Sequence, residues 1–445
     1  MLNVCNYACE KEGAIIKKVK ILLPILVICL LLSGCSSLHI SSINDLITPV
    51  SPGGDDAGIL AAVDEYCKSG YSVKVPLSGH YTTSFIRYDL SGDGNDEAVA
   101  FYEPADKLST VEMALLKKIG SGWKVVKSIT GEGTDVSSVE FCDLNNDGNV
   151  EIIVCWSVIS RSTASNLCVY KQKEKGDDYS IQLLDNSVSS SDFVCADVNG
   201  DGVNEVLAFT TGSASSSPKA ELYSFSSGKK RLIGETKLDS AIISFDNIVC
   251  GETDEGVSIY ADAVRSSGGS MVTELLYWSN YYDSVISPFY SYTTGRTKDT
   301  TRSNMINSRD IDGDGEIEIP LDRSLSSLPE EITAQNWVSY RNTVLNHNTY
   351  SIACEKDCYL LVLKDDLLSK LTFTYTSDAR ELTAKSGKEE VFKILTVLKS
   401  DYDSSKFADY TEIYSDSGFA YLVKVNPQSA VKVSTDDIKN SIRTY

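Results

Sequence analysis

The residues of this chain best suited to chemistry are aspartates, asparagines and glutamates that recur with one spacing. Four segments read D-x-[D/N/S]-x-D-G-x-x-E and begin at Asp89, Asp143, Asp197 and Asp310. Oxygen-bearing side chains at positions 1, 3 and 5, with a glycine at position 6 that permits a sharp turn, supply the hard ligands that Ca²⁺ prefers. Plain polar turns use the same residue types, but four copies in one register favour a metal.

The predicted calcium ligands stand at positions 1, 3, 5 and 9 of each copy. They are Asp89, Ser91, Asp93 and Glu97; Asp143, Asn145, Asp147 and Glu151; Asp197, Asn199, Asp201 and Glu205; and Asp310, Asp312, Asp314 and Glu318. Carboxylates this close together repel one another unless a cation neutralises them. We therefore expect structural Ca²⁺ in these loops.

The loops are not EF-hands. Position 12, where an EF-hand carries an acidic ligand, is Ala100, Val154, Ala208 or Leu321. The flanking segments, such as 84–88 and 98–102, have the β-branched and aromatic composition of strands. Each loop is predicted to join two strands.

The loops belong to a longer repeat. The starts at 89, 143 and 197 are 54 residues apart, and one further step reaches Gly251, where the aspartates are lost and Ile259 stands at position 9. A hairpin pattern recurs about 26 residues after each start, including the degenerate copy. Four strands in such a period are the content of a β-propeller blade, and the units are predicted to begin near residues 80, 134, 188, 242 and 301.

The first residues predict export. Three lysines at 17, 18 and 20 precede an apolar run at 21–32 and the sequence Leu32-Ser33-Gly34-Cys35. This order is typical of a lipoprotein signal peptide over 1–34, with Cys35 as the lipidated residue and a tether over 35–54. An uncleaved anchor or an ordinary signal peptide is the alternative. Attachment to the membrane is expected through the lipid, on a Gram-positive-type cell surface.

Units of this kind resemble the FG-GAP/VCBS repeats of integrin-α-like propellers, whose blades carry a DxDxDG loop between their first two strands. With the lipobox, the linker, residues 310–320 and residues 359–362, the chain resembles an uncharacterised group of Gram-positive bacterial lipoproteins. The match covers residues 44–320 and is weak beyond them. It implies a calcium-binding propeller in the cell envelope, but it names no ligand. Ser91 at position 3 and the degenerate fourth loop depart from the pattern.

The predicted fold class is mainly β: a β-propeller-like repeat domain with calcium loops, preceded by one helix and followed by a small α+β module. The helix begins at Asp55, with Ile59, Leu60, Val63, Tyr66 and Cys67 on one face. The helix and repeats are assigned to 55–362, and the α+β module to 363–445. Alternatively, the strands after 363 complete one or two further blades.

The net charge excludes nucleic acid as a partner. Removing residues 1–34 takes away four lysines and two glutamates, which changes the formal charge from −21 to −23. Binding a phosphate backbone requires clustered Lys and Arg. A protein or a glycan is the expected ligand, and a group of tyrosines and one tryptophan at 277–292 suits such a surface or simply suits strands.

No catalytic constellation is visible. The three histidines, His39, His80 and His347, do not recur in register. Of the eight cysteines after Cys35, most are expected to be free thiols, and a bridge between Cys354 and Cys358 is possible. We expect a non-enzymatic, extracellular calcium-binding protein; the alternatives are an enzyme (lyase or hydrolase) acting on an extracellular polysaccharide, or an envelope-assembly or signalling scaffold.

Overall fold

The computed structural model describes residues 53–157, 165–175, 178–213, 216–266, 269–325 and 328–444. The chain divides into two compact units, Met1–Ala57 and Gly58–Tyr445. The predicted signal peptide, the predicted lipidation site Cys35 and the tether up to residue 52 lie outside the described residues. The account below concerns the second unit and the helix that leads into it.

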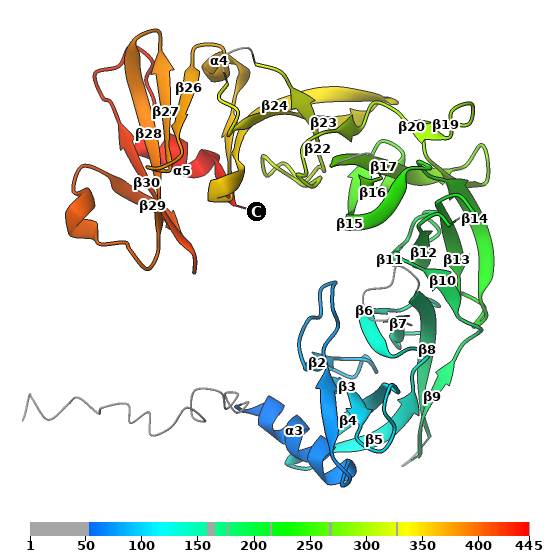
Figure 1. The fold of residues 1–445 in the computed structure, drawn as a ribbon. Helices are drawn as coiled ribbons and strands as arrows, with labels where there is room; N and C mark the ends of the chain where they lie inside the picture. Colours follow the sequence, from blue (N-terminus) through cyan, green and yellow to red (C-terminus); the bar gives the residue numbers. More distant parts are fainter. Residues whose placement is uncertain are drawn as a thin grey trace, which may run out of the picture. The chain divides into compact units, whose positions relative to one another are not determined.

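The described chain is mainly β, as predicted, and consists of antiparallel sheets of which none closes on itself (Figure 1). The first three sheets share one plan, in which an acidic loop joins the first two strands of a meander. Their strands are β1 (Tyr71–Lys74), β2 (Phe85–Tyr88), β3 (Glu97–Pro104), β4 (Glu112–Ile119) and β5 (Gly122–Thr130); β6 (Asp135–Cys142), β7 (Glu151–Ser157), β8 (Ser165–Lys175), β9 (Asp178–Leu183) and β10 (Val188–Ser190); and β11 (Asp192–Ala196), β12 (Glu205–Thr210), β13 (Lys219–Ser224) and β14 (Arg231–Lys237).

The fourth and fifth sheets continue the plan with changes. In the fourth, a tight turn replaces the acidic loop, and a long excursion over 287–309 follows the last meander strand. In the fifth, the acidic loop is closed by a single bridge between Arg309 and Glu318. The strands are β15 (Ile242–Thr253), β16 (Gly256–Arg265), β17 (Ser270–Ser279), β18 (Ser284–Ile286) and β21 (Thr301–Arg302); the separate pair β19 (Tyr290–Ser291) and β20 (Arg296–Thr297); and β22 (Ile319–Arg323), β23 (Thr333–Arg341), β24 (Val344–Cys354), β25 (Tyr359–Leu363) and β31 (Ile442–Thr444).

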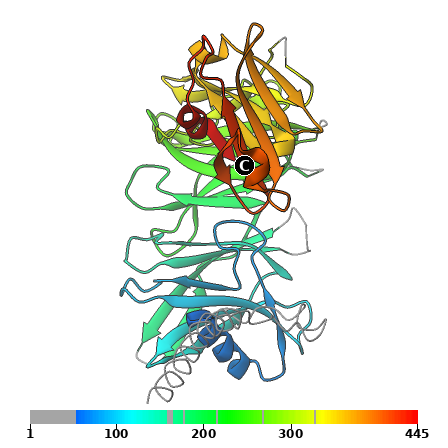
Figure 2. The ribbon, with the colours of Figure 1, turned by 90° about the vertical axis from the view of Figure 1, so that its left-hand side faces the viewer.

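A sixth sheet follows, with short helical segments beside it. Its order is β26-β27-β28-β30-β29. The bounds are β26 (Thr372–Thr376), β27 (Glu381–Ser386), β28 (Glu389–Leu398), β29 (Thr411–Ser415) and β30 (Phe419–Val425), with α4 (Asp365–Leu368), α5 (Thr435–Ser441) and the 3₁₀ turns Glu355–Asp357 and Ser404–Phe407. The helix α5 lies beside β25, β29 and β30 (Figures 1 and 2), and Ser434 caps it by accepting a hydrogen bond from the Asp437 amide.

The second strands of the units are buried on both faces. In β3, Val99 and Phe101 pack toward β7, whereas Ala98 and Ala100 pack toward the helix α3 (Asp55–Tyr66). Alternation places successive side chains on opposite faces, so each sheet contributes to two hydrophobic cores. The same alternation in β7 and β12 links the first four sheets face to face.

The outer face of the first sheet is covered by α3, through Ile59 and Val63. Tyr66, predicted on the same helical face, is 51% exposed, because the helix ends there. The fifth sheet shares its core with the sixth, where Ile352 and Leu361 pack with Phe392 and Val423. The strands on both sides of residue 363 therefore belong to one core.

Candidate metal loops

The four acidic loops occupy equivalent places in their sheets. Position 9 begins the strand after the loop at Glu97, Glu151 and Glu205, and in the fifth sheet Glu318 forms the bridge that precedes β22. The sixteen predicted ligands thus lie in four loops, and each loop stands at the same place in its sheet.

The aspartate at position 1 organises each loop. One carboxylate oxygen accepts a hydrogen bond from the position 5 amide at 3.0–3.3 Å, and the other accepts one from the position 6 amide at 2.9 Å, in all four copies. The position 5 aspartate in turn accepts from the position 7 amide at 2.8–3.0 Å. These contacts fold the loop around its carboxylates, and glycine at position 6 takes a positive φ, +86° at Gly94.

The buried glutamate at position 9 joins the end of the loop to its beginning. Its Oε2 accepts the position 2 amide at 2.9–3.1 Å in every copy, and its side chain is buried. Burial raises the pKa of Glu151, and it raises the pKa of Glu205 and of Glu318 to about 7. Nearby aspartates in the same loops raise these pKa values further. The loops therefore hold negative charge that a divalent cation would relieve.

The residue at position 3 determines which side chain donates a hydrogen bond to Oε1, the second carboxylate oxygen of the position 9 glutamate. Asn145 and Asn199 donate their side-chain amides to Glu151 and Glu205 at 2.7 and 3.1 Å. Asp312 has no proton to donate, and in that loop Asn348 of β24 donates to Glu318 at 2.8 Å instead. In the fifth sheet the hydrogen bond to the glutamate therefore comes from a neighbouring strand and not from position 3 of the loop.

The last loop has the most concentrated carboxylates. Oxygens of Asp310, Asp312 and Asp314 lie within 4.8 Å of one another, and so do those of Asp314, Glu316 and Glu318. Burial, with Asp314 and Asp310 beside it, raises the pKa of Asp312. All the donors are hard oxygens, the set that suits Ca²⁺. These acidic clusters are therefore able to hold a metal ion.

Basic side chains distinguish the loops. In the second, Lys171 contacts Asp147 directly and lies 3.6 Å from Glu151. Burial raises the pKa of Asp147, but the hydrogen bonds from Lys171 and Asn149 and the charge of Lys171 together outweigh it, and the pKa is lowered. Lys117, also 28 residues after its loop start, is 3.2 Å from Glu97. The corresponding residue of the third unit is the uncharged Phe225.

Neighbouring loops touch through position 8. The Val150 amide donates to the Leu90 carbonyl of the preceding loop at 2.9 Å, and the Asn204 side chain donates to the Asp143 carbonyl at 3.3 Å. A Cβ on Gly92 would lie 2.6 Å from the Gly148 carbonyl oxygen, so only glycine fits this approach. The first three loops consequently form a contiguous row.

The degenerate fourth unit contains buried charge that the sequence reasoning missed. Asp262, fully buried in β16, accepts bonds from Arg302 at 2.8 Å, from Thr273 at 2.6 Å and from the Ser308 amide at 2.6 Å. Arg302 belongs to the excursion over 287–309, which this ion pair ties to the sheet. Charged residues inside apolar strand runs, as in Tyr260-Ala261-Asp262-Ala263, were the available signal.

A second buried hydrogen-bond network joins the same excursion to Glu274 of β17 and to Asp239 before β15. Glu274 accepts bonds from the Asp239 amide at 2.7 Å, from Thr297 at 2.7 Å and from Ser287 at 3.1 Å. Asp239 is paired with Arg296 at 2.9 Å. Burial raises the pKa of Glu274 to about 7. Both networks have partners inside the fold and hold the excursion in place.

The described histidines are engaged by neighbours. His347 contacts Asn336 through Nδ1 at 2.5 Å and Asp365 through Nε2 at 2.8 Å, and it stacks on Tyr350. His80, mostly exposed, contacts Glu140 at 2.7 Å. His347 thus has a hydrogen-bond partner at each ring nitrogen.

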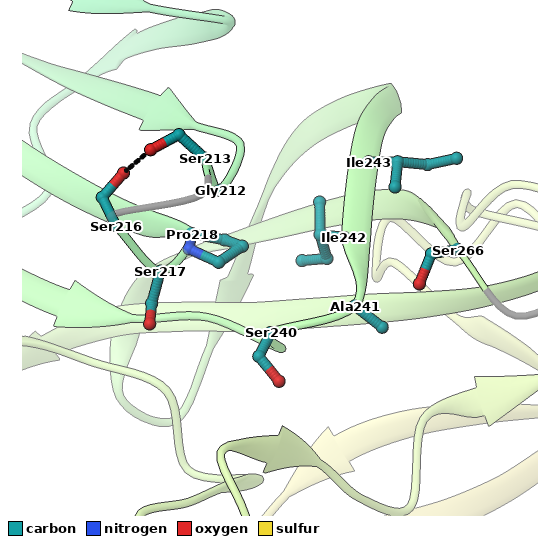
Figure 3. A pocket seen from close by; sticks show the side chains of 10 residues that line it. All are labelled: Gly212, Ser213, Ser216, Ser217, Pro218, Ser240, Ala241, Ile242, Ile243 and Ser266. Atoms are coloured by element: carbon teal, nitrogen blue, oxygen red, sulfur yellow. Dashed lines mark hydrogen bonds between the residues drawn. The ribbon is translucent and has the colours of Figure 1, made fainter.

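A hollow of about 480 Å³ lies between the β12–β13 connection and the start of β15 (Figure 3). Ser213 and Ser216, whose hydroxyls are 2.8 Å apart, line it with three further serines and with the apolar side chains of Pro218, Ile242 and Ile243. Its described lining therefore offers hydroxyl groups for hydrogen bonds beside an apolar surface.

Several predicted recognition tyrosines are at the surface. Tyr281, Tyr282 and Tyr292 are 87%, 66% and 76% exposed. Tyr277 instead is buried, and its hydroxyl lies 3.4 Å from that of Tyr340. The group is therefore divided between core and surface.

Comparison with known proteins places no further constraint on the site: no family model matches the chain, and no curated protein matches its sequence. In the part of the chain that the structure describes, no helix combines the length and the hydropathy needed to cross a membrane.

Proposed function

We propose that this chain is a lipid-anchored, extracytoplasmic protein that binds Ca²⁺ structurally and presents its β-sheet repeats to a protein or glycan ligand, without catalysing a reaction. One observation carries the calcium proposal: four loops separated in sequence have the same hydrogen bonds around carboxylates at positions 1, 5 and 9. Turn chemistry alone does not require a buried glutamate beneath each turn.

The ion would be held by the side chains at positions 1, 3 and 5 of each loop. Glutamate at position 9 is already bonded to the position 2 amide and would support the loop from below. A bound Ca²⁺ would supply positive charge to these carboxylates and so stabilise the junction of the first two strands. Weak affinity, with a dissociation constant of about 10⁻⁴ to 10⁻³ M, suits sites that face the outside of a cell.

We further propose that the first five sheets are propeller-like blades of the FG-GAP/VCBS kind. Face-to-face cores between consecutive sheets support this. Because α3 covers the outer face of the first sheet and the sixth sheet shares a core with the fifth, we propose that both terminal sheets of the repeat have a covered face. Covered terminal faces are what a stack of repeats requires for solubility.

The ligand face is proposed at the exposed tyrosines Tyr281, Tyr282 and Tyr292. Aromatic rings with a polar tip suit sugars and protein surfaces. A glycan panel with the double variant Tyr281→Ala/Tyr282→Ala tests this face: retained binding would remove it, and turnover of a glycan would favour the enzyme.

Thermal unfolding tests the calcium proposal. Residues 36–445 retain every hydrophobic cluster found among the described residues, so this fragment is a suitable sample. We expect the unfolding midpoint to rise with excess Ca²⁺ and to fall with a chelator. Asp143→Ala/Asp147→Ala should reduce the shift.

The matched control removes the same charge at a distance from the acidic loops. Asp378→Ala/Asp401→Ala deletes two exposed carboxylates on turns of the sixth sheet and should leave the calcium-linked shift unchanged. A midpoint that ignores Ca²⁺ in the unmodified chain would refute the metal assignment. Equal loss of the shift in both double variants would show that net charge, rather than the loop, is responsible.

A further inference from the structure

The hairpin formed by β4 and β5 exposes an apolar side chain at its end. Gly120 and Ser121 make the two-residue turn, because Ile119 and Gly122 are partners in the register of the two strands. The side chain of Ile119 is 53% exposed. A single exposed apolar residue is ordinary, but a contiguous group of them marks an interaction surface. The neighbours of Ile119 therefore decide whether this hairpin has a partner.

Ile119 belongs to a larger apolar surface. Tyr66, the last residue of α3, is 51% exposed. Both residues line a hollow of about 420 Å³ together with the half-buried Trp123 of β5. The indole of Trp123 packs on the helix, since a Cβ added to Gly58 would lie 2.9 Å from its Cδ1 atom. The helix end and the hairpin thus present aromatic and aliphatic side chains side by side (Figure 1).

Lysines accompany these apolar side chains. Residues 117–127 contain four lysines and no acidic residue, in a chain whose formal net charge is −21. Lys118 and Lys124 are exposed, and the Lys118 ammonium lies 5.9 Å from the centre of the Trp123 ring. The apolar group and these two lysines are called the tip surface below: Tyr66, Lys118, Ile119, Trp123 and Lys124.

We propose that the tip surface docks on the anionic head groups of a lipid bilayer. This inference rests on the proposed function, in which a lipid on Cys35 holds the chain at a membrane. Tryptophan and tyrosine suit the boundary between head groups and acyl chains, because they combine an apolar ring with a polar group. Apolar side chains beside lysines are the composition that binds this boundary. Lysines near an anionic membrane surface add electrostatic attraction.

The position of the tip surface in the chain suits a bilayer as its occupant. Twenty residues separate Cys35 from Asp55, where α3 begins. Fully extended, they would span about 70 Å, so a lipid on Cys35 would keep the start of α3 within that distance of the bilayer. Docking is then an intramolecular step, for which individually weak contacts suffice. The tip surface would add a second, reversible attachment to that of the lipid.

An acidic residue within the tip region opposes docking. Glu65 is exposed and lines the same hollow as Tyr66 and Trp123, so its carboxylate would face lipid phosphates of like charge. The adjacent Asp64 accepts a hydrogen bond from the Tyr71 hydroxyl at 2.9 Å. We therefore expect a fragment without its lipid to bind anionic vesicles weakly, and to bind them more tightly when Glu65 is replaced by glutamine.

The test is co-flotation of residues 36–445, which lack the lipid, with vesicles at low ionic strength. Vesicles of phosphatidylglycerol and phosphatidylcholine in equal parts should bind the fragment, and vesicles of phosphatidylcholine alone should not. Lys118→Gln/Lys124→Gln should weaken binding about 25-fold, since each lysine contributes a factor of about five, equivalent to about 1 kcal/mol. Ile119→Ser should also weaken binding, and Glu65→Gln should strengthen it.

Tryptophan fluorescence shows which part of the chain meets the lipid. Brominated lipids in the anionic vesicles should quench part of the emission of the unmodified fragment, and Trp123→Phe should remove this quenching. Trp156 and Trp337 are fully buried and should not respond. Quenching that persists in Trp123→Phe would overturn the proposal, because another surface would then contact the bilayer.

The matched control removes two exposed lysines elsewhere in the chain. Lys298→Gln/Lys388→Gln should bind as the unmodified fragment does, and both double variants should keep its unfolding midpoint. Four results would each overturn the proposal: no binding to anionic vesicles, equal binding to uncharged vesicles, equal loss in both double variants, or a dimer in sedimentation that Ile119→Ser dissociates, which would assign the surface to a second copy.

Failure of this inference is distinguishable from failure of the proposed anchor. Mass spectrometry of the expressed full chain tests for a lipid on Cys35 independently of the vesicles. A lipidated chain whose fragment does not bind vesicles would overturn the docking alone. An unlipidated chain whose fragment binds them through the tip surface would overturn the lipid anchor and support the docking.

Discussion

Replacing Glu274 by glutamine should change how the stability of this protein depends on pH. The side chain is fully buried and accepts three hydrogen bonds, from the Asp239 amide, Thr297 and Ser287. Glutamine has nearly the same shape: its oxygen can accept from Asp239 and Thr297, and its amide can donate to the Ser287 hydroxyl. The substitution thus removes the titration with little change in packing.

The magnitude follows from the pKa. Burial raises the pKa of Glu274 from 4.5 to about 7, and one pKa unit corresponds to about 1.4 kcal/mol. Between these pH values the folded protein keeps a proton that the unfolded chain has lost. The free energy of unfolding of the unmodified protein therefore falls by about 3 kcal/mol, through this group alone, as pH rises from about 4.5 to above 7.

The assay is urea unfolding of residues 36–445 and of Glu274→Gln at several pH values between 4.5 and 8, with chelator present. Other titrating groups, including Glu205 and Glu318, are shared and cancel in the difference between the two proteins. The stability of the variant relative to the unmodified protein should rise by about 3 kcal/mol across this range. Glu255→Gln, at the β15–β16 turn, serves as the control for the loss of one carboxylate. A flat or falling difference for Glu274→Gln would refute the reasoning.

Two further substitutions and one deletion test other parts of the structure. Lys171→Gln removes the ammonium beside Asp147 and should tighten Ca²⁺ binding at the second loop by a factor of about 1.4 to 5, because such partly exposed pairs contribute about 0.2–1 kcal/mol; calorimetric titration giving unchanged or weaker binding would contradict this. Arg302→Met leaves Asp262 buried without its cation and should lower the free energy of unfolding by about 3–5 kcal/mol, and a loss in urea below about 1 kcal/mol would argue against a buried pair. Deleting residues 442–445 removes β31 and should lower the unfolding midpoint by several degrees, whereas an unchanged midpoint in calorimetry would show that β31 contributes nothing.

The acidic loops could be predicted from the sequence because their hydrogen bonds join residues that are close together in the chain. Asp143 bonds to amides four and five residues later, and Glu151 bonds to an amide seven residues earlier. Nine residues therefore contain both partners of each contact. The hairpin of the degenerate unit was predicted for the same reason, since β17 and β18 pair across a short turn.

The buried ion pairs were not predicted because their partners are distant in sequence. Asp262 meets Arg302 forty residues later, and Asp239 meets Arg296 fifty-seven residues later. Polar residues such as Thr297 and Ser308 read as loop surface until a buried carboxylate is placed beside them. The exchange of Asn for Asp at position 3 likewise required Asn348, thirty residues away from Glu318.

The strand β31 connects the two parts of the chain that the predicted boundary at residue 363 separates. This last strand pairs with β25, Arg443 donates to the Ile311 carbonyl at 3.2 Å, and Arg309 donates to the Thr444 carbonyl at 3.3 Å. In the first loop the equivalent position 2 carbonyl, that of Leu90, accepts a bond from the loop that follows. Among the described residues no acidic loop follows the last one, and Arg443 of β31 makes this contact instead. We therefore expect residues 363–445 to be needed for the stability of the last metal loop.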